Sequence, residues 1–358
     1  MPTLQDHLQF DALSPQSQAA PFEISHSEAH RLVKDLHRIN PARYWTDLLT
    51  TVLVGWTSFV AAVVARPFSP LMFAAIAVSI FALYRGLSFL HEISHQTSRS
   101  LPGFETAWNV LVGFPLLMPT FLYTGVHVDH HKLSTYGTEE DPEYLPFAKS
   151  WLSTTLFALN ALWIPLLLLV RFLLLTPVAW VSRPVALRLV THASSFTMNL
   201  RYRRQVTPEL LRQVHRQSAV IWIFCLGVIA LTVAGALSWQ VFLVWLTVVT
   251  LISFLNAFRT LGAHAYESTG QPTDRTGQLL DSIDTPGMFW TELWAPVGLR
   301  YHALHHYFPG IPYHNLREGY RRLAGTLPVG PGYRKMTSPS LIHSLVTLYR
   351  KGMRRLRG

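Results

Sequence analysis

The chain has 358 residues, of which 49% are apolar and only 14% are charged, and its formal net charge is +10. Soluble domains carry about a quarter charged residues, so this composition excludes an ordinary soluble domain and indicates an integral membrane protein. The basic residues lie between long apolar runs, where they suit an anionic membrane face, so we expect a lipid bilayer and no nucleic acid as partner. The single cysteine, Cys225, excludes an intramolecular disulfide and a thiolate metal cluster.

Residues 1–44 are predicted to form a cytoplasmic N-terminal segment with a short amphipathic helix. In this segment Ala29, Leu32, Val33 and Leu36 recur on one helical face, and several basic residues stand nearby. The positive-inside rule therefore places this end of the chain in the cytoplasm. The first residues lack the basic and then apolar order of a secretory signal, so we expect no cleaved leader.

The remainder, residues 45–358, is predicted to form one membrane domain with four spans, each close to the ~20 residues that a bilayer requires. The spans are residues 45–65, 71–90, 218–237 and 241–262. Short connections predict that they pair as two antiparallel hairpins, and the near absence of basic charge in these connections places them outside. Residues 91–216 and 263–358 then form a cytoplasmic helical cap. The predicted fold is an all-α integral membrane protein.

Two further apolar stretches, residues 108–122 and 151–181, are expected to be interfacial or re-entrant helices. If the second crossed the membrane once, the arginine-rich loop that follows would lie outside, against the positive-inside rule. Pro165 and Pro177 favour a break or kink within this stretch.

The histidines are clustered, and the first cluster is His91-Glu92-Ile93-Ser94-His95, at the expected cytoplasmic end of the second span. Its two imidazoles stand at positions i and i+4, on one face of a helix. The same pattern describes a zinc protease helix, in which Glu92 would be the general base. This cluster alone therefore leaves the chemistry open.

The second and third clusters share the spacing His-x-x-His-His, which brings three imidazoles to one side of a helix. They consist of His127, His130 and His131, and of His302, His305 and His306. Together with the first cluster they exceed what one tetrahedral zinc can use, so two metal ions are predicted. Imidazole suits zinc, copper and iron, so the residues alone leave the metal undecided.

The order of the three clusters across paired apolar hairpins resembles the membrane fatty acid desaturase and hydroxylase family, and residues 136–144 and 301–314 resemble its bacterial members. The resemblance implies two non-haem irons with O2 as co-substrate. It adds His264, at the end of the last span, to the metal ligands. One branch of the family has an asparagine one turn before this histidine. Here Thr260 has that place and Asn256 lies another turn back, so their contribution is left open.

No fused cytochrome b5 haem motif is visible, so the resemblance implies an external electron-transfer protein of the ferredoxin, rubredoxin or cytochrome b5 type. Histidine ligands are tuned by hydrogen bonds to their outer ring nitrogens. Six acidic residues are candidates for such bonds, none of them with a catalytic role: Glu92, Asp129, Asp141, Glu143, Asp281 and Asp284.

The predicted function is an O2-dependent desaturase of a fatty acyl chain, carried as an acyl lipid, acyl-CoA or acyl-carrier protein. A hydroxylase or ketolase of a lipid or carotenoid on the same scaffold is an open alternative, because one oxidant can serve both reactions. An intramembrane zinc protease that uses His91, Glu92 and His95 is a third reading, and it leaves the other clusters unexplained. The short exterior connections and the large cytoplasmic part predict an active site that faces the cytoplasm. The resemblance favours a bacterial inner membrane.

Overall fold

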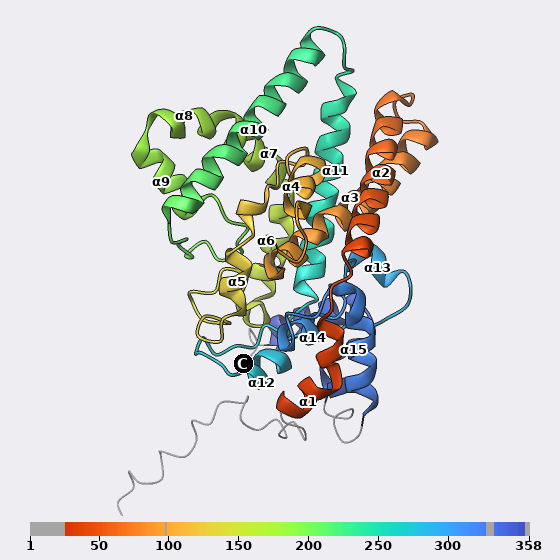
Figure 1. Cartoon of the computed structure of the whole chain (residues 1–358), viewed down its shortest axis with the longest axis vertical. Helices are drawn as coiled ribbons and strands as arrows, with labels where there is room; N and C mark the ends of the chain where they lie inside the picture. The colour runs from red at the N-terminus through yellow and green to blue at the C-terminus, as the bar shows by residue number, and fades with distance from the viewer. Residues whose placement is uncertain (1–25, 97–98, 327–332, 355–358) are drawn as a thin grey trace, which may run out of the picture.

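The computed structural model describes residues 26–96, 99–326 and 333–354, and within these residues it is helical, with isolated β-bridges in place of a sheet. The long helices pair as two hairpins. These are α2 (Pro41–Val64) with α3 (Pro70–His95), and α10 (Pro208–Val233) with α11 (Gln240–Leu261). Both hairpins turn at the same end of the molecule (Figure 1). The predicted all-α membrane fold is confirmed.

Three of these long helices begin with the same local signal, a proline in the first turn after a capping side chain. The side chains of Asn40, Ser69 and Thr207 each accept a hydrogen bond from a backbone N–H in the first turn. A proline at this place loses no intrahelical hydrogen bond. Two helices therefore start before the predicted spans 45–65 and 218–237, because hydropathy does not detect a capped polar first turn.

The hairpins bury one face against each other and expose the other. Helix α11 packs against α3, and Leu83, Val248 and Ile252 are fully buried between the long helices. On the outer faces large aliphatic side chains are exposed, for example Leu53 at 68% and Ile223 at 65%. Apolar surface of this extent is stable only against lipid.

A fifth helix, Ile164–Val181, is also long and apolar enough to cross a membrane. It consists of α7 (Ile164–Leu169), the π-helical turn η7 (Val170–Leu174) and α8 (Leu175–Val181). Pro165 stands in the first turn of α7, where the chain restarts after α6 (Trp151–Leu159) and η6 (Asn160–Leu162). Pro177 does not break α8. The predicted count of four spans thus omits one candidate, and the position of this helix in the membrane stays a prediction.

Residues 108–122 do not form the single interfacial or re-entrant helix that we expected. They follow α4 (Phe104–Trp108) as the π-helical turn η3 (Asn109–Gly113), an irregular stretch and the short η4 (Thr120–Leu122). Trp56 and Trp245 donate their indole N–H groups to the carbonyls of Leu111 and Pro115, at 2.7 and 2.9 Å. Irregular backbone is tolerated beside a membrane where the protein buries it and satisfies its polar groups.

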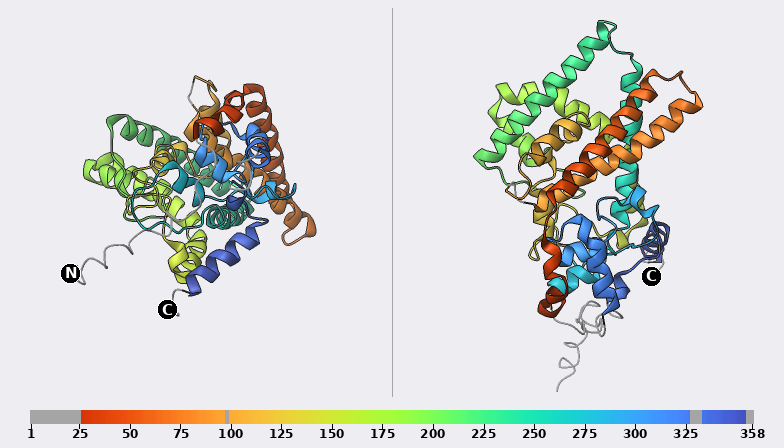
Figure 2. Two further views of the ribbon diagram at one scale, coloured as in Figure 1. Left: turned by 90° about the horizontal axis from the view of Figure 1, so that it is seen from below. Right: turned by 45° about the vertical axis from the view of Figure 1, so that its right-hand side comes forward.

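The cap gathers at the opposite end from the hairpin turns (Figure 1). Its helices are α1 (His26–Val33), α5 (Val126–His131), α12 (Arg275–Leu280), α13 (Thr291–Trp294), α14 (His302–Tyr307), α15 (Tyr313–Gly325) and α17 (Leu341–Arg354). Helix α1 packs against α15, and α17 lies beside α6 (Figure 2).

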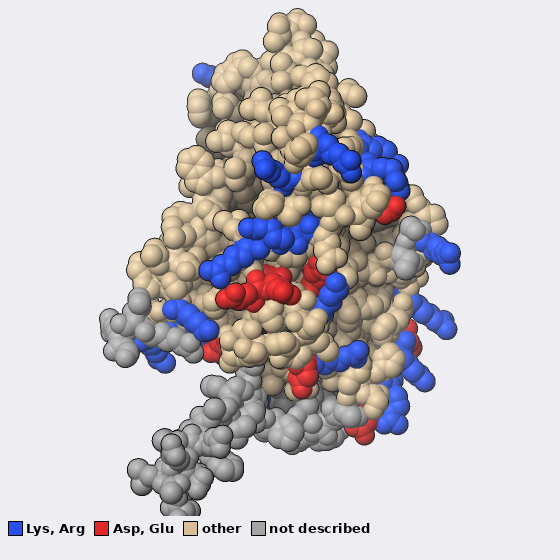
Figure 3. Space-filling view, turned by 90° about the vertical axis from the view of Figure 1, so that its left-hand side faces the viewer, with Lys and Arg blue, Asp and Glu red and all other residues tan. Residues whose placement is uncertain are grey.

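A band of Lys and Arg crosses the face that carries α8, α9 (Arg183–His192) and α10, and the surface on the hairpin side of this band is almost free of charge (Figure 3). Such a band is typical of the boundary between the bilayer and water.

Candidate metal centre

The nine predicted histidine ligands converge as two neighbouring groups at the cap end of the long helices, and within each group the ligand atoms lie within 4.8 Å of one another. The first histidine group is His91, His95, His127, His131 and His305. The second histidine group is His130, His264, His302 and His306.

Each His-x-x-His-His cluster contributes to both groups. On α5 the i and i+4 pair, His127 and His131, belongs to the first group, and the intervening His130 belongs to the second. On α14 the order is reversed, because His302 and its i+4 partner belong to the second group while His305 belongs to the first. Residues at i and i+4 share a helix face, whereas i+3 lies to one side of it, so a short helix between two sites can serve both.

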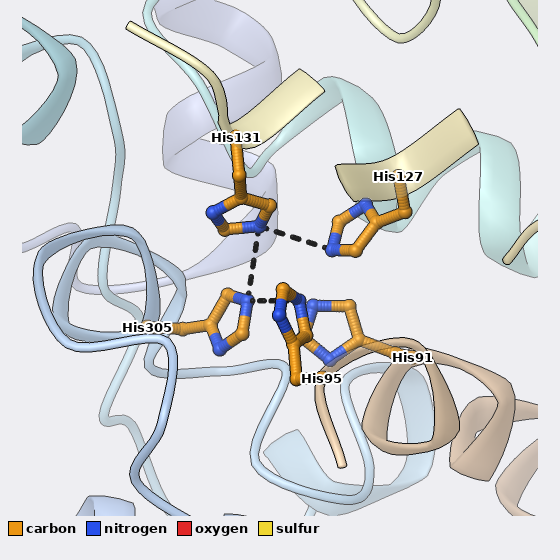
Figure 4. A group of neighbouring side chains, drawn as sticks. All are labelled: His91, His95, His127, His131 and His305. Carbon is orange, nitrogen blue, oxygen red and sulfur yellow. Dashed lines mark hydrogen bonds between the residues drawn. The ribbon is translucent and has the colours of Figure 1, made fainter. Parts of the chain in front are cut away.

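The imidazole nitrogens lie at distances that fit a metal ion. In the first group, Nε2 of His305 is 3.1 Å from Nε2 of His95 and 3.1 Å from that of His131 (Figure 4). In the second group, Nε2 of His302 is 2.9 Å from that of His264 and 3.1 Å from that of His306. Imidazole binds a metal at about 2.1 Å, so two ligands at right angles lie about 3 Å apart. The residues therefore fit a metal ion in each group.

The unpaired ring of His91 independently indicates a metal ion in the first group. Both of its ring nitrogens are buried and have no hydrogen-bond partner among the described residues, while its ring lies 4.1 Å from that of His305 and 4.6 Å from that of His127, centroid to centroid. Buried polar atoms are nearly always satisfied, so an unpaired imidazole inside a ring of imidazoles indicates a ligand that it would bind.

The electrostatics of the site favour neutral imidazoles, which is the form that binds metals. Burial, and then the neighbouring histidines, hold the pKa of most cap histidines well below its usual value of 6.5. This holds for His127, His131, His264, His302, His305 and His306. His130 differs: burial lowers its pKa, but the carboxylates of Asp141, Glu143 and Asp281 together more than offset this effect and the pKa is raised.

Carboxylates orient two of the histidines through their outer ring nitrogens. Nδ1 of His130 lies 2.9 Å from Oδ1 of Asp141, and Nδ1 of His127 lies 3.1 Å from Oε1 of Glu143. These bonds leave Nε2 of each ring to face its group, as in other histidine metal sites. Of the six acidic candidates, Asp141 and Glu143 thus contact histidines directly.

Two tyrosines, for which no role was predicted, also contact the outer ring nitrogens. The hydroxyl of Tyr123 lies 2.8 Å from Nδ1 of His127. The hydroxyl of Tyr136 lies 2.9 Å from Nδ1 of His264 and donates to Oδ2 of Asp281 at 3.0 Å, so Asp281 acts on His264 through Tyr136. Tyr123 precedes His127 by one helical turn, and that spacing was the only signal available for it.

The other three acidic candidates hold the backbone or other side chains. Asp284 accepts from the backbone N–H groups of Ala303 and Leu304, at 2.8 and 3.2 Å, and so caps the first turn of α14. Burial raises the pKa of Asp284 to about 7. Asp129 accepts from Tyr202, at 2.6 Å, and from Lys132.

Glu92 accepts from the hydroxyl of Tyr44 and from the backbone N–H of Tyr313, which lies 3.1 Å away. Its carboxylate is therefore committed to tying α3 to α2 and α15. A general base of a zinc protease would have to face a water on the metal, so this arrangement removes the support for the protease reading.

Gly137 shapes the turn that carries Asp141. Its backbone has φ of +69°, a Cβ built on it would lie 2.6 Å from Oγ of Ser268, and its N–H donates to Oδ2 of Asp141 at 2.7 Å. Only glycine combines this conformation with this close approach.

Comparison with known proteins agrees with this site. Residues 65–337 match the fatty acid desaturase family, and this range includes both histidine groups. A ceramide hydroxylase of Caulobacter vibrioides (strain NA1000 / CB15N) is 37% identical to the chain over 326 residues, which cover 90% of this chain and 93% of that protein.

Proposed function

Because the chain belongs to the fatty acid desaturase family, whose members use a di-iron centre, we propose that it is an O2-dependent membrane hydroxylase of a ceramide-like lipid. The observation that carries this proposal is the pair of histidine groups, five and four imidazoles respectively, in a chain similar to a ceramide hydroxylase over nearly its whole length. We place the site on the cytoplasmic side, as the charge distribution favours, and the enzyme in a bacterial inner membrane, as the resemblance of residues 136–144 and 301–314 to bacterial members of the family favours.

The first group would hold one iron and the second group the other, and the bound di-iron centre supplies the oxidation of an unactivated C–H bond by O2. In hydroxylation one oxygen atom enters the C–H bond and the other leaves as water, with a pair of electrons and a pair of protons taken up. The electrons come from an external donor of the ferredoxin, rubredoxin or cytochrome b5 type.

The chain's own residues would hold the metal ions, and they orient the imidazole rings and exclude water from them. Imidazoles bind a metal in their neutral form, so as ligands they would add no charge to the centre. Asp141, Glu143 and the hydroxyl of Tyr136 fix three of the rings. His302, His305 and His306 are almost fully buried, which keeps bulk water away from their side of the centre.

Hydroxylation is preferred to desaturation because of the ceramide hydroxylase relative. The predicted desaturase activity rests on the family match alone, and the family contains both activities. Desaturation of the acyl chain, as acyl lipid, acyl-CoA or acyl-carrier protein, is therefore the second candidate.

The mass of the lipid product distinguishes hydroxylation from desaturation. Membranes that contain the protein are incubated with a ceramide, a reduced electron donor and isotopically labelled O2, and the masses of the lipids are measured by mass spectrometry. Gain of one labelled oxygen atom supports hydroxylation, and loss of a pair of hydrogens supports desaturation. Membranes with the His305→Ala variant are the control and should give neither product. A wild-type protein that alters no lipid would overturn both candidates.

A further inference from the structure

An open groove of about 370 Å3, here called the α9 groove, lies on helix α9, and none of its lining residues belongs to the two histidine groups. Its apolar wall consists of Val185, Leu189 and Ala193. Two polar side chains, Arg188 and His192, also line it. The volume falls within the ~300–1,000 Å3 of sites that bind small molecules. An apolar wall next to a cation suits an amphipathic ligand that carries negative charge.

The part of the chain that surrounds the α9 groove is strongly basic. Residues 151–220, here called the basic segment, contain eight arginines and a single acidic residue, Glu209, which pairs with Arg212 at 2.8 Å. On this face of the molecule Lys and Arg form the band that is typical of a membrane boundary (Figure 3). An excess of positive charge at such a boundary attracts the phosphate groups of anionic lipids.

A buried arginine lies behind the wall of the α9 groove. Arg171 is only 7% exposed, and its Nε donates to the carbonyl of Ala193 at 3.3 Å. Its other hydrogen bonds are also to neutral groups, Oγ1 of Thr176 at 3.3 Å and Oγ of Ser194 at 3.1 Å. Among the residues that the structure describes, neither Arg171 nor Arg188 forms an ion pair. Because a buried charge is costly without a counter-charge, an anion in the groove would be stabilised.

The surroundings of the α9 groove are suited to contact with the bilayer. Helices α8 and α9 pack against each other and against α10, at the left edge of the molecule in Figure 1. Val181, between α8 and α9, is 86% exposed, and the side chains of Trp180 and Leu187 are exposed as well. Exposed apolar side chains beside a basic band suit lipid chains below the head groups. A lipid chain in the groove can therefore continue along an apolar surface.

We propose that the α9 groove binds one anionic phospholipid of the bilayer. The phosphate accepts hydrogen bonds from the guanidinium of Arg188, and the charge of Arg171 behind Ala193 attracts it further. One acyl chain lies against Val185 and Leu189. The bound lipid supplies the counter-charge that Arg171 lacks and holds α9 in place beside α8 and α10. This proposal is independent of the reaction that the metal centre catalyses.

The test is a titration of the purified, iron-loaded protein in neutral detergent, with bound lipid measured by native mass spectrometry. The two probes are phosphatidylglycerol and phosphatidylcholine with the same acyl chains, and the wild type should bind one phosphatidylglycerol more tightly than phosphatidylcholine. Arg188→Gln should weaken phosphatidylglycerol binding about tenfold, as expected for loss of a charged hydrogen bond, and leave phosphatidylcholine binding unchanged. The matched control is Arg216→Gln, because Arg216 is an exposed arginine of the basic segment that does not line the groove.

A second variant, Ala193→Phe, keeps both arginines but fills the α9 groove, so it should also weaken phosphatidylglycerol binding. The side chains of Arg188 and Ala193 are exposed, so both variants should keep the iron content and melting temperature of the wild type. Equal binding of the two lipids by the wild type, an equal loss in Arg216→Gln, or unchanged binding in Ala193→Phe would show that only general surface charge acts, and would overturn the proposal.

The last arm separates a lipid from a soluble phosphate compound. Glycerol phosphate in excess should not displace the bound phosphatidylglycerol, because it lacks the acyl chain that contacts Val185 and Leu189. Displacement at millimolar glycerol phosphate, on the order of the weak affinity of a single phosphate contact, would assign the α9 groove to a soluble ligand and overturn the proposed lipid.

Discussion

Nε2 of His305 lies 3.1 Å from Nε2 of His95, although 210 positions separate the two residues along the chain. The same atom of His305 also lies 3.1 Å from Nε2 of His131, so one imidazole joins α14 to α3 and to α5. The first histidine group is therefore complete only when the first hairpin and both parts of the cap are folded together.

His305→Ala should remove metal from the first group and leave the second group intact, because its two nearest ring contacts are both in the first group. We expect the iron content of the purified protein to fall from about two to about one per chain, since a metal site that loses a ligand binds far more weakly. Elemental analysis measures this. The exposed His343 in α17 provides the control, and His343→Ala should keep all its iron. Unchanged iron in His305→Ala would show that His305 is not a ligand.

Asp141→Asn should weaken metal binding by about 10-fold to 100-fold, because the carboxylate is fully buried and fixes His130 through Nδ1. The measurement is competition for iron against a chelator. Asp129→Asn is the matched control, since Asp129 lies next to His130 in the chain but binds Tyr202 and Lys132 instead of a histidine. Equal affinities in the two variants would contradict the role given to Asp141.

Glu92→Gln should lower the free energy of unfolding by about 1–3 kcal/mol and leave the iron content unchanged. The reason is that Glu92 is hydrogen-bonded to Tyr44 and Tyr313, whereas its contact to a histidine, Nδ1 of His91, is longer, at 4.0 Å. Thermal unfolding and elemental analysis of the same preparation check both parts. A stable variant without metal would return Glu92 to the metal site.

Much of this site was predictable because its signals are local. Helix periodicity predicts that His91 and His95 share a face, and the repeated His-x-x-His-His spacing indicates metal binding. The division of each His-x-x-His-His cluster between two groups was not predictable, because α5 and α14 have only six residues each and tertiary packing sets their rotation. The sequence also did not predict which of the acidic residues contact the histidines. Asp129 is next to His130 in the chain and Asp141 is 11 positions away, yet the fold turns Asp141, not Asp129, toward the ring of His130.

The metal-free protein should lose stability as the pH falls below about 6.5. The buried cap histidines, His302 and His306 among them, have a pKa well below that of the unfolded chain, so the unfolded state binds more protons in this range. Above about 6.5 neither state is protonated and the effect vanishes. Melting temperatures at neutral and acidic pH measure it. The double variant His302→Asn, His306→Asn should show a shallower decrease, and a wild-type profile as shallow as that of the variant would contradict the prediction.

The most direct test of the two-group metal centre is anomalous diffraction at the iron absorption edge from crystals of the iron-loaded protein. The account predicts two peaks, one among His91, His95, His127, His131 and His305, and the other among His130, His264, His302 and His306. A single peak, or a signal at the zinc edge alone, would contradict it.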